Sequence, residues 1–179
     1  MRKFLAFLLR KIGWKIVLQT EIPAKCVLCV APHTSNWDFI IAISFYKSIG
    51  GNPHFLMKKD WFFFPLSTIL RSMGGIPVNR DKKSSLSKQM VELFEKETDF
   101  QLAIAPEGTR KKNSRWKTGF YHIALAANVP ITLVYLDYGK KEIGVEKIFY
   151  PTGNVESDIQ EIKNYYKNIQ PKHPEKFSI

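Results

Sequence analysis

Short apolar runs alternate along the chain with longer stretches in which apolar residues recur at helical spacing. The run from Cys26 to Ala31 is representative, because it is continuously apolar and is followed by a proline. Runs of this kind, bounded by glycine, proline or polar residues, are typical of buried strands. We expect strands at 26–31, 53–57, 75–79, 100–105, 130–136 and 145–150.

The stretches between these runs show the pattern of amphipathic helices. In the clearest one, Leu86, Met90 and Phe94 fall on a single helical face. We expect helices at 36–49, 61–73, 84–98, 118–128 and 155–169. Alternating strands and helices predict one α/β domain whose central sheet is largely parallel and flanked by helices.

The first segment, residues 1–20, has a pattern of its own. Wound as a helix, it gathers its cations largely on one face. The opposite face carries six apolar side chains: Phe4, Leu5, Leu8, Leu9, Ile12 and Ile16. Its unbroken apolar run is far shorter than the roughly 20 residues that span a bilayer. This pattern, with Trp14 as an interfacial side chain, favours an amphipathic helix lying in a membrane interface. A helix that simply covers the core has the same pattern. Residues 21–179 then form the α/β domain.

The charge of the chain is strongly positive, with 27 Lys+Arg against 16 Asp+Glu and a formal net charge of +11. Such a balance favours a polyanionic partner, which can be nucleic acid, an anionic membrane surface or a phosphate-bearing small molecule. Five cations precede the first acidic residue, Glu21, so much of the excess lies in the N-terminal segment. This placement favours the membrane surface.

The two cysteines, Cys26 and Cys29, have the spacing of some redox and zinc sites. On a strand, however, residues three apart point to opposite faces, so the two sulfur atoms are not expected to meet. We therefore interpret both as small core residues in a reducing cytoplasm.

Polar clusters follow three of the expected strands directly. They lie at residues 33–38, at Asn79-Arg80 and at residues 107–110. Ligands of open parallel sheets bind outside the carboxyl ends of the strands. If the sheet is parallel, the three clusters meet at one edge.

The first cluster contains His33 and Asp38. A neutral imidazole can remove the proton of an attacking hydroxyl, and a carboxylate behind it stabilises the imidazolium that forms. With His33 in the loop and Asp38 in the first turn of the helix, the two side chains can meet. The alternative is purely structural, because Ser35 and Asp38 have the spacing of a capping box, which would leave His33 as a loop residue.

The other two clusters carry arginines. In the string Glu107-Gly108-Thr109-Arg110 the glycine permits a tight turn, and the guanidinium can bind a phosphate through paired hydrogen bonds. Arg80 is a candidate for a second phosphate ligand. The alternatives are a polar surface turn and a solvated cation. No metal-binding, dinucleotide or nucleophile-elbow motif occurs in the sequence, which favours direct attack by an acceptor hydroxyl.

Taken together, the clusters resemble the phospholipid/glycerol acyltransferase family, which includes the 1-acylglycerol-3-phosphate acyltransferases. Four blocks match in order across about residues 26 to 136: the H-x-x-x-x-D pair His33 and Asp38, Gly75–Arg80, Pro106–Arg110, and Val129–Ile131. The chain departs from the family pattern at Pro32, Ala105, Lys111 and Leu133. These departures leave the His/Asp pair intact and bear on the acceptor more than on the reaction.

The resemblance implies that residues 21–179 are a glycerolipid acyltransferase domain. His33 would be the general base and Asp38 its partner, and the acceptor site would be shaped by Arg80, Glu107, Gly108, Thr109 and Arg110. The acyl donor would be acyl-CoA or acyl-acyl carrier protein, and the reaction would need no metal and no other cofactor.

The expected function is transfer of a fatty acyl group to a hydroxyl of a lysolipid, with 1-acylglycerol-3-phosphate as the favoured acceptor, at the cytoplasmic face of a membrane. One alternative is the same chemistry on a lyso-aminolipid or a lipid A precursor. Another is a basic, non-catalytic module that binds membranes or nucleic acid, although nucleic acid is the disfavoured partner. A thioesterase that uses the same pair on water is a third.

Overall fold

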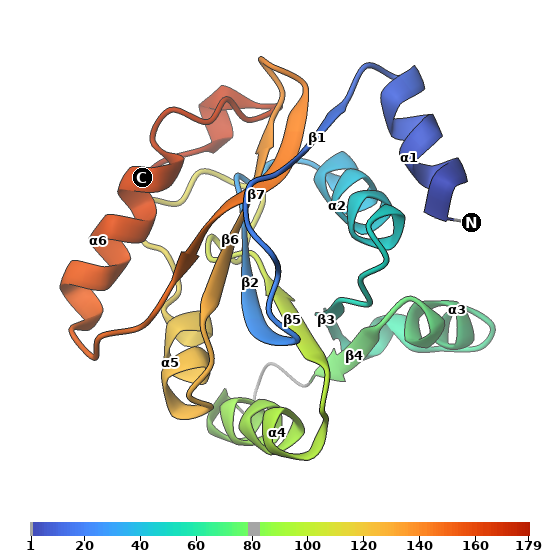
Figure 1. The fold of residues 1–179 in the computed structure, drawn as a ribbon. Coiled ribbons are helices and arrows are strands. Elements are labelled where there is room, and N and C mark those ends of the chain that lie inside the picture. Colours follow the sequence, from blue (N-terminus) through green and yellow to red (C-terminus); the bar gives the residue numbers. More distant parts are fainter. Residues whose placement is uncertain (1, 79–82) are drawn as a thin grey trace.

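The computed structural model describes residues 2–78 and 83–179, and its framework is a single twisted sheet with helices on both faces (Figure 1). The strands are β1 (Lys15–Leu18), β2 (Lys25–Ala31), β3 (His54–Lys58), β4 (Gly75–Val78), β5 (Phe100–Ile104), β6 (Ile131–Asp137) and β7 (Glu142–Phe149). The helices are α1 (Arg2–Lys11), α2 (Asn36–Ser48), α3 (Leu66–Ser72), α4 (Lys83–Lys96), α5 (Gly119–Ala126) and α6 (Val155–Tyr166). Short 3₁₀ turns lie at Lys59–Trp61 and Pro174–Lys176.

The strand order is β1-β7-β6-β2-β5-β3-β4. The five strands from β6 to β4 run parallel to one another, whereas β7 is antiparallel to β6 and carries β1 as a parallel edge strand. β6 and β7 are joined only by residues 138–141, which is too short for a crossover helix, so the two strands form a hairpin. The expected α/β class with a largely parallel sheet is confirmed.

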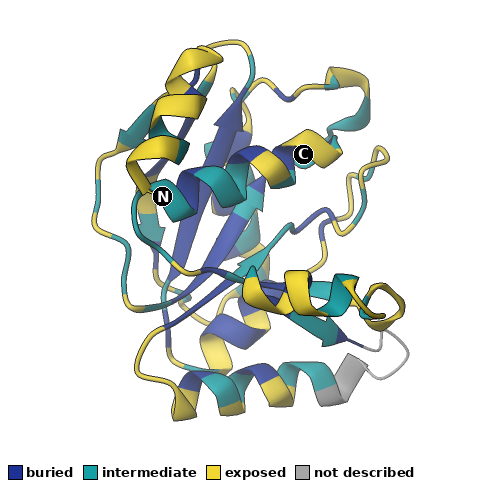
Figure 2. Ribbon diagram, turned by 90° about the vertical axis from the view of Figure 1, so that its right-hand side faces the viewer, coloured by how far each residue is buried: buried dark blue, intermediate teal, exposed yellow. Residues whose placement is uncertain are grey.

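The two faces of β2 pack against different helices. Val27 and Cys29 belong to the apolar cluster beneath α4, α5 and α6, whereas Cys26 and Leu28 belong to the cluster beneath α1 and α2. Both cysteines are buried and unpaired, on opposite faces of the sheet, as the strand pattern predicted. Figure 2 shows these buried strands between helices whose outer faces are exposed.

The N-terminal helix is present but shorter than expected. It ends at Lys11, because Gly13 has a φ of +85° and closes a Schellman turn in which the Trp14 N–H donates to the carbonyl of Leu9 at 2.9 Å. The turn directs Trp14 into the core, where only 5% of its surface is exposed, and Ile16 then lies in β1. The expectations that Ile16 continues the helix and that Trp14 is interfacial are therefore wrong.

The helix expected at 61–73 is also shorter and begins only at Leu66. The reason is Pro65, because a proline disfavours helical geometry in the residue before it. Across residues 2–78 and 83–179, no helix combines the length and the apolar character needed to cross a membrane.

Candidate functional site

The loops after β2 and β5 meet at the carboxyl edge of the sheet. These strands are direct neighbours, so His33, which follows β2, lies beside Glu107, which follows β5. The backbone N–H of His33 donates to Oε1 of Glu107 at 2.7 Å. Two of the three predicted polar clusters are therefore brought together. The third contains Arg80, which lies outside the described residues.

Helix α2 begins with the capping box that the sequence indicated. Ser35 is the N-cap, and its hydroxyl accepts a hydrogen bond from the Trp37 N–H at 3.2 Å. Oδ2 of Asp38 accepts from the backbone N–H groups of Thr34 and Ser35, at 2.7 Å each. These bonds fix the loop that carries His33, because they tie its backbone to the first turn of the helix.

The same carboxylate also faces the imidazole. Nδ1 of His33 lies 3.5 Å from Oδ2 of Asp38. The Asp38 side chain is 1% exposed and the His33 side chain 26%, so the carboxylate is enclosed while the ring still reaches solvent. Capping and support of His33 are thus not exclusive alternatives, because one oxygen atom does both. The other ring nitrogen, Nε2, takes no part in this contact.

The surroundings of Asp38 favour its ionised form. Burial by itself would raise the pKa of this carboxyl. Contacts with His33 and Tyr138, and hydrogen bonds from the backbone of Ser35 and Thr34, outweigh burial and bring the pKa below its ordinary value. Asp38 therefore remains a carboxylate that can stabilise an adjacent imidazolium.

Tyr138 is the residue of this site that sequence reasoning missed. It directly follows β6, the other neighbour of β2, and its hydroxyl donates to Oδ1 of Asp38 at 2.7 Å. Ligands of open parallel sheets bind outside the carboxyl ends of the strands. Tyr138 is a polar side chain in such a position, so the sequence did carry a signal for it.

Glu107 is deeply buried, with 2% of its surface exposed. Burial raises its pKa to about 7; the hydrogen bond from the His33 backbone opposes this rise, and the charge of Asp38 adds to it. The Glu107 carbonyl accepts from Nδ2 of Asn113 at 3.0 Å, which fixes the loop after β5 from its other side. The carboxyl therefore titrates near neutrality at the centre of the site.

The remaining residues of the block are less enclosed. Gly108 has a φ of +64°, and an added Cβ would lie 2.7 Å from side-chain atoms of Lys117. Thr109 is half-buried and accepts a hydrogen bond from the backbone of Lys111, whereas Arg110 is exposed. The turn thus presents Arg110 to solvent beyond the carboxyl end of β5, where an anionic ligand can reach it.

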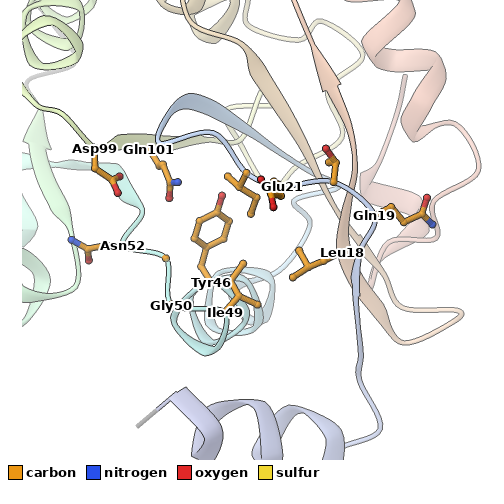
Figure 3. A pocket seen from close by; sticks show the side chains of 12 residues that line it. Leu18, Gln19, Glu21, Tyr46, Ile49, Gly50, Asn52, Asp99 and Gln101 are labelled. Carbon is orange, nitrogen blue, oxygen red and sulfur yellow. The ribbon is translucent and has the colours of Figure 1, made fainter.

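A cavity of about 610 Å³ lies elsewhere in the molecule (Figure 3). Asp99 and Gln101, at the beginning of β5, line it, together with Tyr46 and the turn after α2. Because Glu107 follows the opposite end of β5, this cavity lies at the other edge of the sheet. None of the predicted site residues lines it.

Comparison with known proteins identifies the family of this domain. Residues 14–136, most of the chain, match the model of the family described as Acyltransferase. The chain belongs to this acyltransferase family. The family resemblance noted in the sequence is thereby confirmed.

Individual relatives of this acyltransferase-family chain carry more specific names. Human 1-acyl-sn-glycerol-3-phosphate acyltransferase beta is 29% identical over 112 residues, which are 59% of this chain and 40% of the human protein. The 1-acyl-sn-glycerol-3-phosphate acyltransferase of Limnanthes douglasii is 26% identical over 125 residues, or 65% of this chain and 43% of the plant protein. The matched region is therefore about two-fifths of each of these relatives.

The fold is also similar to that of a solved structure. The crystal structure of the 1-acyl-sn-glycerophosphate (LPA) acyltransferase PlsC from Thermotoga maritima superposes with a TM-score of 0.58 and 16% sequence identity. The match covers 95% of this chain and 80% of the Thermotoga chain. At this identity the likeness bears on the fold, which agrees with the layered α/β architecture described above.

Proposed function

We propose that the protein transfers a fatty acyl group from acyl-CoA or acyl-acyl carrier protein to a hydroxyl of a lysolipid, with 1-acylglycerol-3-phosphate as the acceptor. The observation that carries the proposal is the approach of His33 Nδ1 to the buried Asp38 carboxylate, 3.5 Å apart, in an acyltransferase-family domain. This arrangement is that of a general base with an orienting anion.

The proposed reaction is a single displacement on the thioester. Nε2 of neutral His33 accepts the proton of the acceptor hydroxyl as the oxygen attacks the thioester carbonyl carbon. Asp38 stabilises the imidazolium that forms. When the tetrahedral intermediate collapses, the carbon–sulfur bond breaks and the imidazolium returns the proton to the departing thiolate. No metal or other cofactor takes part in this scheme.

Two features support a phosphate-bearing acceptor. The relatives compared above are named for action on 1-acyl-sn-glycerol-3-phosphate. In addition, Arg110 is exposed in the loop directly after Glu107, on the same edge of the sheet as His33. A guanidinium there can bind a phosphate through two parallel hydrogen bonds. Arg80 is assigned the same role on its sequence position alone.

We further propose that the protein works at the cytoplasmic face of a membrane, as a peripheral protein on an anionic surface. Helix α1 exposes apolar side chains, including Phe4 at 60% and Phe7 at 53%, beside the exposed cations Lys3 and Arg10. This combination is typical of helices that lie in a membrane interface.

A second exposed apolar segment also supports membrane binding. The turn before α3 exposes Phe63 by 57% and Phe64 by 88%, and Lys59 beside it is also exposed. Helices α1 and α3 lie on the same side of the molecule, on either side of α2 (Figures 1 and 2). Exposed apolar groups of this kind on one side favour a lipid surface as the partner.

Incubation with labelled acyl-CoA, or acyl-acyl carrier protein, and a panel of lysolipids tests the chemistry. We expect labelled diacyl product, and a loss of about 10²- to 10⁴-fold in turnover for His33→Ala and Asp38→Asn. His122→Ala, at an exposed histidine on α5, is the matched control. Near-normal turnover by a folded His33→Ala would refute the mechanism, and free fatty acid released without an acceptor would point to a thioesterase.

Sedimentation with anionic vesicles tests the membrane proposal. Phe4→Ser and Phe64→Ser should each weaken vesicle binding while activity on detergent-dispersed lysolipid stays normal. Tyr150→Ser is the matched control, because Tyr150 is 68% exposed but directly follows β7, which is separated from β3 and β4 by three other strands of the sheet. Equal vesicle binding by all three variants and the parent protein would exclude these surfaces as the membrane contact.

A further inference from the structure

The two oxygen atoms of Asp38 have different partners. Oδ2 accepts the backbone N–H groups of Thr34 and Ser35 and faces Nδ1 of His33. Oδ1 accepts the hydroxyl of Tyr138 at 2.7 Å. The carboxylate is 1% exposed, so solvent has little access to replace a hydrogen-bond donor lost from Oδ1.

Tyr138 is itself held from two directions. Its backbone N–H donates to the carbonyl of Gln170 at 2.8 Å. Its ring packs against the buried indole of Trp14, with the centroids 5.0 Å apart and the planes at 87°. Edge-to-face contacts of this kind are favourable between aromatic rings. The backbone and the ring of Tyr138 are therefore both held in place at the beginning of the β6–β7 turn, with the hydroxyl directed at Asp38.

We infer that Tyr138 is a positioning residue for the His33/Asp38 pair, and that Trp14 supports it by packing against its ring. The inference rests on the proposed general-base role of His33. It extends the site to a residue 100 positions away from Asp38 along the chain, and to the residue that directly follows the turn at the end of α1.

The physical reason is the freedom of a carboxylate to turn about its terminal torsion, which has broad energy minima. A donor on Oδ1 limits this rotation and so keeps Oδ2 directed at the imidazole. Tyr138 is suited to the task because burial, and then its bond to Asp38, raise the pKa of its hydroxyl, which therefore stays a donor at neutral pH. The same bond is one of the contacts that lower the pKa of Asp38.

Removal of the hydroxyl in Tyr138→Phe tests the inference. We expect kcat to fall about 10- to 100-fold, the loss typical of a hydrogen bond to a charged group, with little change in KM for donor or acceptor. The acid limb of the pH–rate profile should also move, because His33 must be neutral to act as the base and the loss of this donor changes both the charge and the direction of the Asp38 carboxylate beside it. The titratable groups facing Asp38 are His33, Tyr138 and, through its charge, Glu107, and only Tyr138 differs between the two proteins compared.

Tyr121→Phe is the matched control. The Tyr121 hydroxyl also donates to a carboxylate at 2.7 Å, but that carboxylate is Asp158, at the beginning of α6. Tyr121 is fully buried, so its variant should lose at least as much stability while kcat and the acid limb stay unchanged. A general effect of deleting a buried hydroxyl would appear in both variants.

A double-mutant cycle tests the support from Trp14. Trp14→Phe should lower kcat by less than Tyr138→Phe does, and should add little in the Tyr138→Phe background, because it acts through the same hydroxyl. Additive losses would overturn this part of the inference. Wild-type kcat and acid limb in Tyr138→Phe, with His33→Ala inactive, would overturn the role of Tyr138 alone. An active His33→Ala would instead overturn the proposed mechanism.

Discussion

The buried carboxyl of Glu107 makes the stability of the fold depend on pH in a predictable way. Its pKa is about 7 in the folded protein, against an ordinary value of 4.5, because burial disfavours the charged form. The folded state thus binds a proton that the unfolded chain releases between these two values. The stabilising contribution is complete below about pH 4.5 and is lost as the pH rises to about 7.

The size of this loss follows from the two pKa values. A difference of about 2.5 between them corresponds to roughly 3 kcal/mol of unfolding free energy, at ~1.4 kcal/mol for each unit. Glu107→Gln removes the titration but keeps an oxygen atom that can accept the N–H of His33. The variant should therefore gain about 3 kcal/mol relative to the parent between pH 4.5 and pH 8.

Urea unfolding of both proteins at several pH values measures this difference directly. The comparison cancels the other titrating groups, because only residue 107 changes. Glu95→Gln, at an exposed carboxylate on α4, is the control and should follow the parent at every pH. Parallel stability curves for the parent and Glu107→Gln across this range would refute the reasoning, since burial would then impose no cost on the charge.

Three further substitutions test other parts of the structure. Gly108→Ala should cost about 1 kcal/mol of unfolding free energy, measured by urea denaturation, because φ is +64° and an L-residue is strained there; an unchanged midpoint would contradict this. Gly13→Ala should cost a similar amount and increase the fluorescence quenching of Trp14 by acrylamide, because the turn at +85° holds this indole in the core. Arg110→Lys should raise KM about 10-fold for a phosphate-bearing lysolipid, because lysine loses paired hydrogen bonding, and should affect a phosphate-free acceptor less. Equal losses on both acceptors would exclude a phosphate-binding role.

The local parts of the site could be predicted from the sequence. His33, Ser35 and Asp38 lie within one loop and one helical turn, so their spacing alone indicated both the capping box and the approach of the imidazole to the carboxylate. The strand pattern placed Cys26 and Cys29 on opposite faces for the same reason, because side-chain direction on a strand depends only on its two-residue repeat. The adjacency of His33 and Glu107 required one further assumption, a parallel sheet, which was correct.

The N-terminal segment shows how a local pattern can mislead. Its apolar residues kept a helical period through Ile16, but Gly13 allows a left-handed turn that ends the helix and begins an edge strand. Whether a glycine continues or ends a helix depends on what the following residues can pack against. Here Trp14 packs against the ring of Tyr138, and strand β1 pairs with β7.

The sequence by itself determined the α/β class, the family and the spacing of the His33/Asp38 pair, because each depends on short blocks of residues or on a repeated local period. Tertiary structure alone decided that Tyr138 meets Asp38, that Glu107 is buried enough to titrate near pH 7, and that Trp14 belongs to the core. The reason is physical. Burial, and contact across about a hundred residues, follow from the order in which strands pair, and that order is set by the packing of the whole sheet and its helices.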